Sequence, residues 1–243
     1  MRKIHYKSNN AYLGMASFES MSEDTLYFLQ MPDYVFVGLN TPIEGNVNVM
    51  NCQLRNIPVV RSAILGRSYL FEAGKNLWIG LASKEQIEEA ILQEILIDAL
   101  KNIGVEATIR INDILAGVQQ LGMTAPSLKI PGGFMVAGQI TFDADFQKVE
   151  ECLVMPNDKW VDKAPATNIG DWILPLSKLT PTTINQFVEA VTVSTAKILN
   201  IDIKDGQFNQ EELAEMTRLK GEYMSNDWLN PIGHFGHLRP GLY

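Results

Sequence analysis

The chain is expected to fold as an α+β protein, with helices packed on a mixed β-sheet. Apolar residues recur at three- and four-residue spacing over residues 83–103, which predicts a long amphipathic helix. Apolar and largely polar residues alternate over residues 105–111, which is typical of a half-buried strand. Strand and helix patterns do not alternate in the regular rhythm of a doubly wound parallel sheet. Together these observations favour a mixed sheet.

The first eighty residues predict one helix followed by short strands. The helix is expected over residues 9–23, with Asn9 or Asn10 as its N-cap. Short apolar runs then predict four strands, at residues 25–29, 34–38, 57–61 and 76–82. For the helix over residues 83–103, Ser83 and Gln86 form a candidate capping box and Gly104 ends it. A further strand is expected over residues 133–142.

The last hundred residues favour helices and a long loop. A short helix is expected over 145–153, and the Asp-, Lys-, Pro- and Asn-rich residues 155–171 indicate a loop. Two helices are expected over 180–199 and 209–224, the second with Asn209 as its cap. We therefore expect a single catalytic-type domain over residues 1–243, with a helical C-terminal extension from about residue 180.

Composition limits the possible partners and location. The 243 residues are 46% apolar, enough to bury a sizeable core, and the net charge is −8. A net negative charge argues against nucleic acid or an anionic membrane as the partner. Two cysteines make no disulfide framework, and no apolar run approaches eighteen residues, so a reduced, cytoplasmic setting is expected.

Three sequence segments carry a family resemblance. Residues 59–81 read VVRSAILGRSYLFEAGKNLWIGL, Asn112-Asp113 follows later, and Lys129-Ile130-Pro131-Gly132 comes after that pair. In this order the segments resemble the lipoate–protein ligase family, within the biotin and lipoate protein ligases. The resemblance runs from about Asn10 to about Leu179. It implies the mixed-sheet core shared with biotin protein ligases and class II aminoacyl-tRNA synthetases.

The resemblance also implies an activity. In such enzymes, ATP with Mg²⁺ activates lipoate or octanoate to an acyl-adenylate. The acyl group then passes to a lysine of a lipoyl carrier domain, of the glycine-cleavage H protein or of the 2-oxoacid dehydrogenase E2 type. The positions that match imply Lys129 as the catalytic residue, Arg61, Gly66, Asn112 and Asp113 at the nucleotide, Asp113 also at the metal, and Tyr69, Phe71, Gly132 and Gly138 at the acyl group.

Elementary chemistry supports some of these roles and leaves alternatives. A lysine ammonium at position 129 can neutralise charge on an acyl carboxylate and a phosphate. The alternative is that Lys129 is an exposed lysine before a strand, with no role in function. Asn112 and Asp113 can bind ribose, phosphate or Mg²⁺, or form an ordinary strand-ending turn. Arg61 can hold phosphate oxygens in a fork, or form a surface ion pair.

The glycine-rich segment of the family is altered in this chain. Ser62 stands at its second arginine, Ile64, Leu65 and Arg67 stand at its serine and two of its glycines, and Phe71 stands at its histidine. Bulky side chains obstruct the approach of backbone N–H groups to an anion. Two further functions therefore stay open: a non-catalytic paralogue that binds an acyl acid or carrier protein, and an ATP-independent octanoyltransferase.

Other candidates carry less weight. His234 and His237 form a pair without a third metal ligand nearby in the sequence, so a metal site there is not favoured. Some octanoyltransferases of the superfamily use a cysteine nucleophile. Cys152 has no histidine nearby in sequence, and we expect it to be a buried structural thiol.

Overall fold

The computed structural model describes residues 1–154 and 168–230. The strands are β1 (Arg2–Lys7), β2 (Thr25–Gln30), β3 (Tyr34–Val37), β4 (Val59–Arg61), β5 (Ser68–Phe71), β6 (Asn76–Ser83), β7 (Thr108–Arg110), β8 (Asp113–Ala116), β9 (Gln119–Ile130), β10 (Gly133–Thr141) and β11 (Lys204–Asp205). The α-helices are α1 (Ala11–Glu19), α2 (Val49–Leu54), α3 (Glu89–Asn102), α4 (Phe146–Cys152), α5 (Ile184–Leu199), α6 (Gln210–Tyr223) and α7 (Asn226–Leu229). Two short 3₁₀ turns lie at Ile169–Asp171 and Leu176–Lys178.

The strands form two sheets, and the larger one is mixed. Its order is β11-β1-β2-β6-β10-β9-β8-β7, and β3 lies between β4 and β5 in the smaller sheet. In the large sheet β1 runs parallel to both of its neighbours, whereas β6, β10, β9, β8 and β7 pair antiparallel in turn. This arrangement confirms the α+β class and the mixed sheet expected from the sequence.

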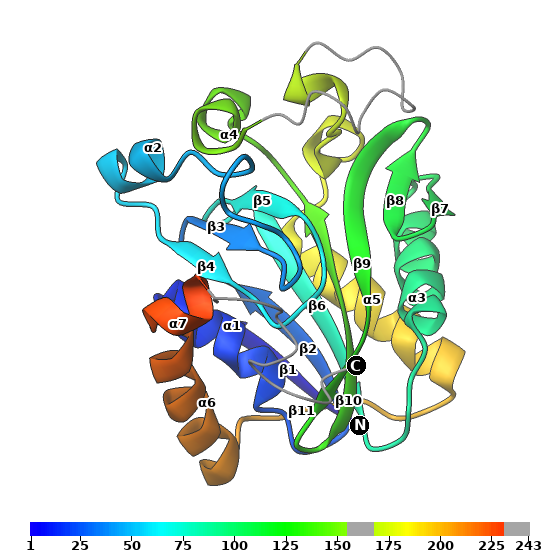
Figure 1. The fold of residues 1–243 in the computed structure, drawn as a ribbon. Coiled ribbons are helices and arrows are strands. Elements are labelled where there is room, and N and C mark those ends of the chain that lie inside the picture. Colours follow the sequence, from blue (N-terminus) through cyan, green and yellow to red (C-terminus); the bar gives the residue numbers. More distant parts are fainter. Residues whose placement is uncertain (155–167, 231–243) are drawn as a thin grey trace.

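Each face of the large sheet is covered by a different set of elements (Figure 1). Helices α3 and α5 cover one face, where Leu92, Ile95 and Leu96 join a core with Phe187 and Val191. Helices α1 and α6 cover the other face together with the small sheet, around Phe18, Phe36, Phe71 and Trp78. The expected docking of the helix containing Ile95 and Leu96 on the sheet is therefore confirmed.

The last two described helices, α6 and α7, are built into this second core. Leu219, Tyr223 and Trp228 are buried in it, and the Trp228 indole N–H donates to the Arg61 carbonyl at 2.8 Å. Asn209 caps α6, as expected, by accepting from the Glu212 N–H. Helix α6 therefore covers α1 and reaches, through α7, the strand that carries Arg61.

Several sequence expectations need correction. The Ser83/Gln86 capping box does not form, because Ser83 still belongs to β6 and the helix begins only at Glu89. The strand expected over residues 105–111 shortens to β7, since Ile111 turns the chain back into β8. Strand β9, the longest of the molecule's described strands, was not predicted. Its residues 121–125 are buried in succession, so the alternation that marks a half-buried strand is absent.

Candidate functional site

Two adjoining pockets lie beside the small sheet and the β8–β9 hairpin. The wide pocket has a volume of about 400 Å³, and the narrow slot has a volume of about 80 Å³. Arg67 and Tyr69 line both of them, so these two side chains form the shared wall. The wide pocket is lined by Leu65, Gly66, Arg67, Tyr69, Arg110, Ile111, Asn112, Asp113, Met123, Thr124 and Pro126.

The narrow slot has a largely apolar lining. Strand β5 contributes Leu70 and Phe71, and α4 and the residue after it contribute Val149 and Leu153. Trp172 and Ile173 complete the opposite side. Helix α4 is held in place by Asp145, whose side chain accepts from the Lys148 N–H at 3.1 Å, and by the Lys148–Asp33 ion pair. Apolar walls of this kind suit a hydrocarbon chain.

A hydrogen-bond network fixes the polar side of the wide pocket. Glu89, at the start of α3, accepts from the Asn112 side-chain N–H at 2.8 Å and from the Thr124 hydroxyl. Gln120 of β9 donates to the Asp113 carboxylate at 2.6 Å. These bonds orient Asn112 and Asp113 at the pocket, whose lining also includes Arg67 and Arg110.

Tyr69 sits where the two pockets meet. Burial, together with the negative charge of Asp113, raises the pKa of its phenol, although a hydrogen bond with Gln120 acts in the opposite direction. The phenol is therefore protonated at neutral pH and can donate a hydrogen bond to a ligand oxygen.

Arg61, which the resemblance implied as a phosphate ligand, is used inside the protein. Its guanidinium donates to the carbonyls of Gly38, Thr41 and Leu229 at 3.0, 2.8 and 3.0 Å. The residue is only 2% exposed, and burial lowers its pKa to about 10, which leaves it charged at neutral pH. The structure therefore does not bring Arg61 to either pocket.

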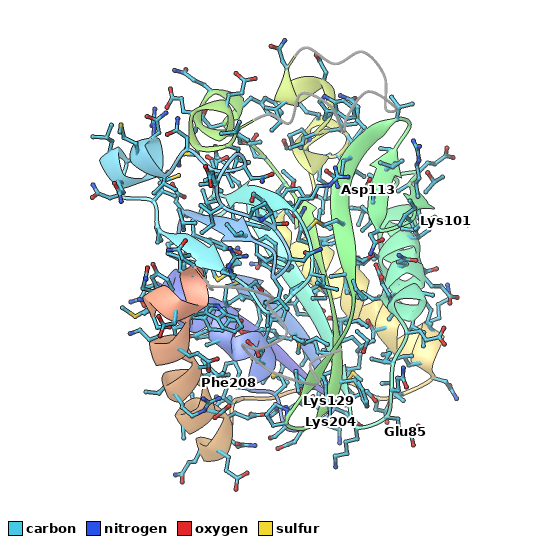
Figure 2. The ribbon with its side chains drawn as sticks, in the orientation of Figure 1. Glu85, Lys101, Asp113, Lys129, Lys204 and Phe208 are labelled. Atoms are coloured by element: carbon cyan, nitrogen blue, oxygen red, sulfur yellow. The ribbon has the colours of Figure 1, made fainter. Side chains whose placement is uncertain are left out.

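Lys129 lies at the end of β9 away from Asp113 (Figure 2), and Gly132 lies in the turn that follows β9. Lys129 is exposed and pairs in register with Phe134, next to the β9–β10 turn. Met123, the register partner of Asp113, is six residues away, or about 20 Å at the usual strand rise of roughly 3.3 Å. Gly132 donates its N–H to the Met21 carbonyl at 3.2 Å, so it serves the packing of that turn. Neither residue lines the pockets described above.

The altered glycine segment is held by the loop that follows β3. The Gly66 N–H donates to the Asn40 side chain at 3.4 Å, and the Gly66 carbonyl accepts from the Thr41 hydroxyl. The Ile64 N–H donates to the Ser62 hydroxyl at 3.0 Å. The N–H groups of Ile64 and Gly66 therefore already have protein partners. Ile64 is buried at 3% exposure, whereas Leu65 lines the wide pocket.

The remaining expected positions divide between the site and the core. Gly66, Tyr69, Asn112 and Asp113 come together in the wide pocket, and Phe71 lines the slot. Gly138 lies behind the site on β10, where a Cβ would stand 3.2 Å from Leu96 of α3. His234 and His237 lie outside the described residues. Cys152 is fully buried, as expected for a structural thiol.

Residues that the sequence did not reveal complete the site. Gln120, Arg110 and Glu89 contact or line it, but Gln120 belongs to the unpredicted strand β9. The Gly117-Val118 turn between β8 and β9 is the local signal that could have revealed the hairpin. In the described residues no group of three His, Cys, Asp or Glu side chains is arranged to hold a metal ion. Among the same residues, no helix is long and apolar enough to cross a membrane.

Comparisons with known proteins agree with the fold. The chain is 16% identical to the bipartite lipoate protein ligase of Thermoplasma acidophilum, solved in a study with its E2 lipoyl domain, at a TM-score of 0.79 over 93% of this chain and 94% of that one. A lipoate-protein ligase A bound with ATP is 15% identical, at 0.78 over 93% and 97%. P. falciparum LipL1 in complex with lipoate is 15% identical, at 0.74 over 96% and 74%.

A search of curated protein sequences finds no match. The sequence model of the lipoyl protein ligase A/B catalytic domain matches residues 10–196, well over half of the chain. The protein therefore belongs to the lipoyl protein ligase A/B catalytic domain family.

Proposed function

We propose that this protein binds a medium-chain carboxylic acid of the lipoate or octanoate kind across the two pockets, and that it forms an acyl-adenylate poorly or not at all. The observation that carries the proposal is the shared wall, where Arg67 and Tyr69 stand between an apolar slot and a wide pocket with charged residues on one side. A carboxylate in the wide pocket beside Arg67 would gain a charge-assisted hydrogen bond. The hydrocarbon end would extend along Leu70 and Phe71 in the slot.

The residues present fit a nucleoside triphosphate such as ATP poorly. Arg61 is engaged by backbone carbonyls, and the N–H groups of Ile64 and Gly66 have side-chain partners. Each backbone hydrogen bond that a charged oxygen cannot make forfeits on the order of 1.5–3 kcal/mol. Two such losses would weaken ATP binding by roughly 150-fold or more, since each 1.4 kcal/mol is about tenfold. Weak or undetectable ATP binding by calorimetry is the expected result.

An ATP-dependent ligase is the second candidate, because the fold matches a lipoate-protein ligase A bound with ATP. Asp113 would then be the carboxylate available to Mg²⁺ in the wide pocket. ATP–pyrophosphate exchange in the presence of octanoate or lipoate separates the two functions. Exchange above background supports the ligase, whereas acid binding without exchange supports the binding protein or an ATP-independent acyltransferase.

Isothermal calorimetry with octanoate and lipoate tests the acid site. Arg67→Ala should weaken octanoate binding at least tenfold, because a hydrogen bond to a charged group contributes about 1.5–3 kcal/mol. Lys101→Ala removes an exposed cation from the last turn of α3, outside the lining of both pockets, and serves as the matched control. Failure of both acids to bind, or equal effects of the two substitutions, would count against the proposal.

A carrier protein is a further part of the proposed function. One structural relative was solved in a study of a ligase and its E2 lipoyl domain. We propose that a lipoyl domain, of the H-protein or E2 type, presents its lysine at the wide pocket. Mixing the protein with an unmodified and an octanoylated lipoyl domain, followed by analytical gel filtration, would test this association.

A further inference from the structure

The turn between β7 and β8 places an isoleucine in an unfavourable backbone conformation. Ile111 has φ = 59°, in the left-handed region. Among residues other than glycine, asparagine and aspartate occupy this region most readily, and for a β-branched side chain it is a genuine outlier. The chain therefore holds an isoleucine where glycine or asparagine would fit with less strain.

Contacts from two other elements maintain this conformation. Gln93 of α3 donates its side-chain N–H to the Ile111 carbonyl at 2.9 Å. On the next residue, Glu89 accepts from the Asn112 side chain at 2.8 Å, and the Thr124 N–H donates to the Asn112 carbonyl at 2.8 Å. Strain that surrounding structure imposes in this way is concentrated at functional sites in proteins.

The Ile111 side chain gains little within the protein itself. It is 84% exposed, the most exposed large apolar side chain among the described residues. It also lines the wide pocket, whose other apolar members are Leu65, Met123 and Pro126. An apolar side chain that is both strained and solvated contributes almost no burial energy to folding. Contact with a bound molecule would supply the missing burial.

We infer that Ile111 is a ligand-binding residue, which closes the wide pocket by packing against the methylene groups of the bound acid. The inference rests on the proposed function and assigns the acid's carboxyl-proximal chain to the wide pocket. Leu65 and Met123 would contact that chain from the pocket wall, and Ile111 from the solvent side. A ligand without an apolar chain would gain nothing from this residue.

Ile111→Gly and Ile111→Asn test the inference, because both residues tolerate the left-handed conformation and remove the apolar contact. The expected result is a dissociation constant for octanoate three to ten times higher in both variants, which corresponds to losing about half the burial of an isoleucine side chain. The melting temperature of the free protein should not fall in either variant. Ile111→Val keeps an apolar contact and should bind octanoate nearly as well as the unaltered protein.

Val118→Ala is the matched control, because Val118 is also 81% exposed on a neighbouring turn but does not line the pocket. Its affinity for octanoate should be unchanged. Unchanged octanoate affinity in Ile111→Gly, with binding by the unaltered protein intact, overturns this inference alone. A lower melting temperature in both Ile111→Gly and Ile111→Asn also overturns it, because Ile111 would then stabilise the fold. Absence of octanoate binding by the unaltered protein overturns both the inference and the proposed function.

Discussion

At the scale of single residues, Arg61 shows how a guanidinium can serve the fold in place of a ligand. It links the loop after β3 to the end of α7 through carbonyls of Gly38, Thr41 and Leu229. Arg61→Ala would remove these donors, and of the three carbonyls the one of Gly38 would keep a bond from the Thr41 N–H. We expect a loss of about 3 kcal/mol or more in the free energy of unfolding, since each unpaired buried group costs about 1–3 kcal/mol.

Urea denaturation followed by tryptophan fluorescence would measure this loss. Arg55→Ala is a suitable control, because Arg55 makes a partly exposed ion pair with Glu151 on the surface. Such pairs contribute about 0–1 kcal/mol. If Arg61→Ala unfolds at the same urea concentration as the control, Arg61 does not hold the loop to α7 as described.

Lys129 provides a second prediction at this scale. The family resemblance implies that Lys129→Ala abolishes adenylate formation, whereas its distance from Asp113 along β9 implies no effect on acid binding. We expect octanoate affinity within about twofold of the unaltered protein, because the side chain is exposed and outside the pocket lining. Calorimetry on the purified variant checks this prediction. A tenfold loss of octanoate affinity would show that Lys129 contributes to the acid-binding site.

At the scale of elements, the segment between β4 and β5 decides what the wide pocket can accept. Its side chains divide, with Ile64 in the core and Leu65 in the pocket wall. Ile64→Ser should therefore destabilise the protein by about 2–4 kcal/mol, through a cavity and a buried hydroxyl, without enlarging the pocket. Leu65→Gly should destabilise the protein less, because Leu65 is only partly buried against the core, and it should widen the pocket and weaken octanoate binding.

Thermal melts and calorimetry on the two variants test that division directly. The converse result, with Ile64→Ser stable and Leu65→Gly unfolded, would indicate that Leu65 lies in the core and Ile64 in the pocket wall. The triple variant with Ile64→Ser, Leu65→Gly and Arg67→Gly is expected to bind ATP no better than the unaltered protein. The Gly66 N–H in it would still donate to Asn40, and the pocket would have lost a cation.

At the scale of the whole molecule, α6 is joined to the N-terminal strand by a buried carboxylate. Glu212 is 1% exposed and accepts from Arg2, from the Ser22 N–H at 2.7 Å and from the Asn209 N–H at 2.9 Å. Burial alone would raise the pKa of Glu212, but these donors outweigh it and lower the pKa below its usual value. The ionised carboxylate therefore stabilises the native state above about pH 4.5.

Glu212→Gln should lower the free energy of unfolding by about 2–4 kcal/mol at pH 7, because Arg2 loses its buried partner. Since the folded pKa is the lower one, the native state binds fewer protons, and the contribution disappears as the pH falls below the unfolded value. The gap between Glu212→Gln and the unaltered protein should thus narrow between pH 6 and pH 3.5. Glu215→Gln, in a partly exposed pair with Arg218, should show a gap under 1 kcal/mol.

The sequence by itself determined the fold class and most elements whose signals are local. Asn10, Asn209 and the apolar period of α3 mark helices because caps and 3.6-residue spacing act within a few residues. The sequence also indicated the family. It identified Gly66, Tyr69, Asn112 and Asp113 as candidate site residues, and these four lie together in the wide pocket.

Tertiary structure alone decided which of the marked residues share a site. Arg61 and Lys129 carry side chains suited to phosphate, but one is enclosed by carbonyls from the β3 loop and α7 and the other lies at the far end of β9. Those partners are distant in sequence, so no local pattern encodes them. Gln120 and Ile111 were not predicted from the sequence for the same reason, because their contacts depend on how β8, β9 and α3 pack together.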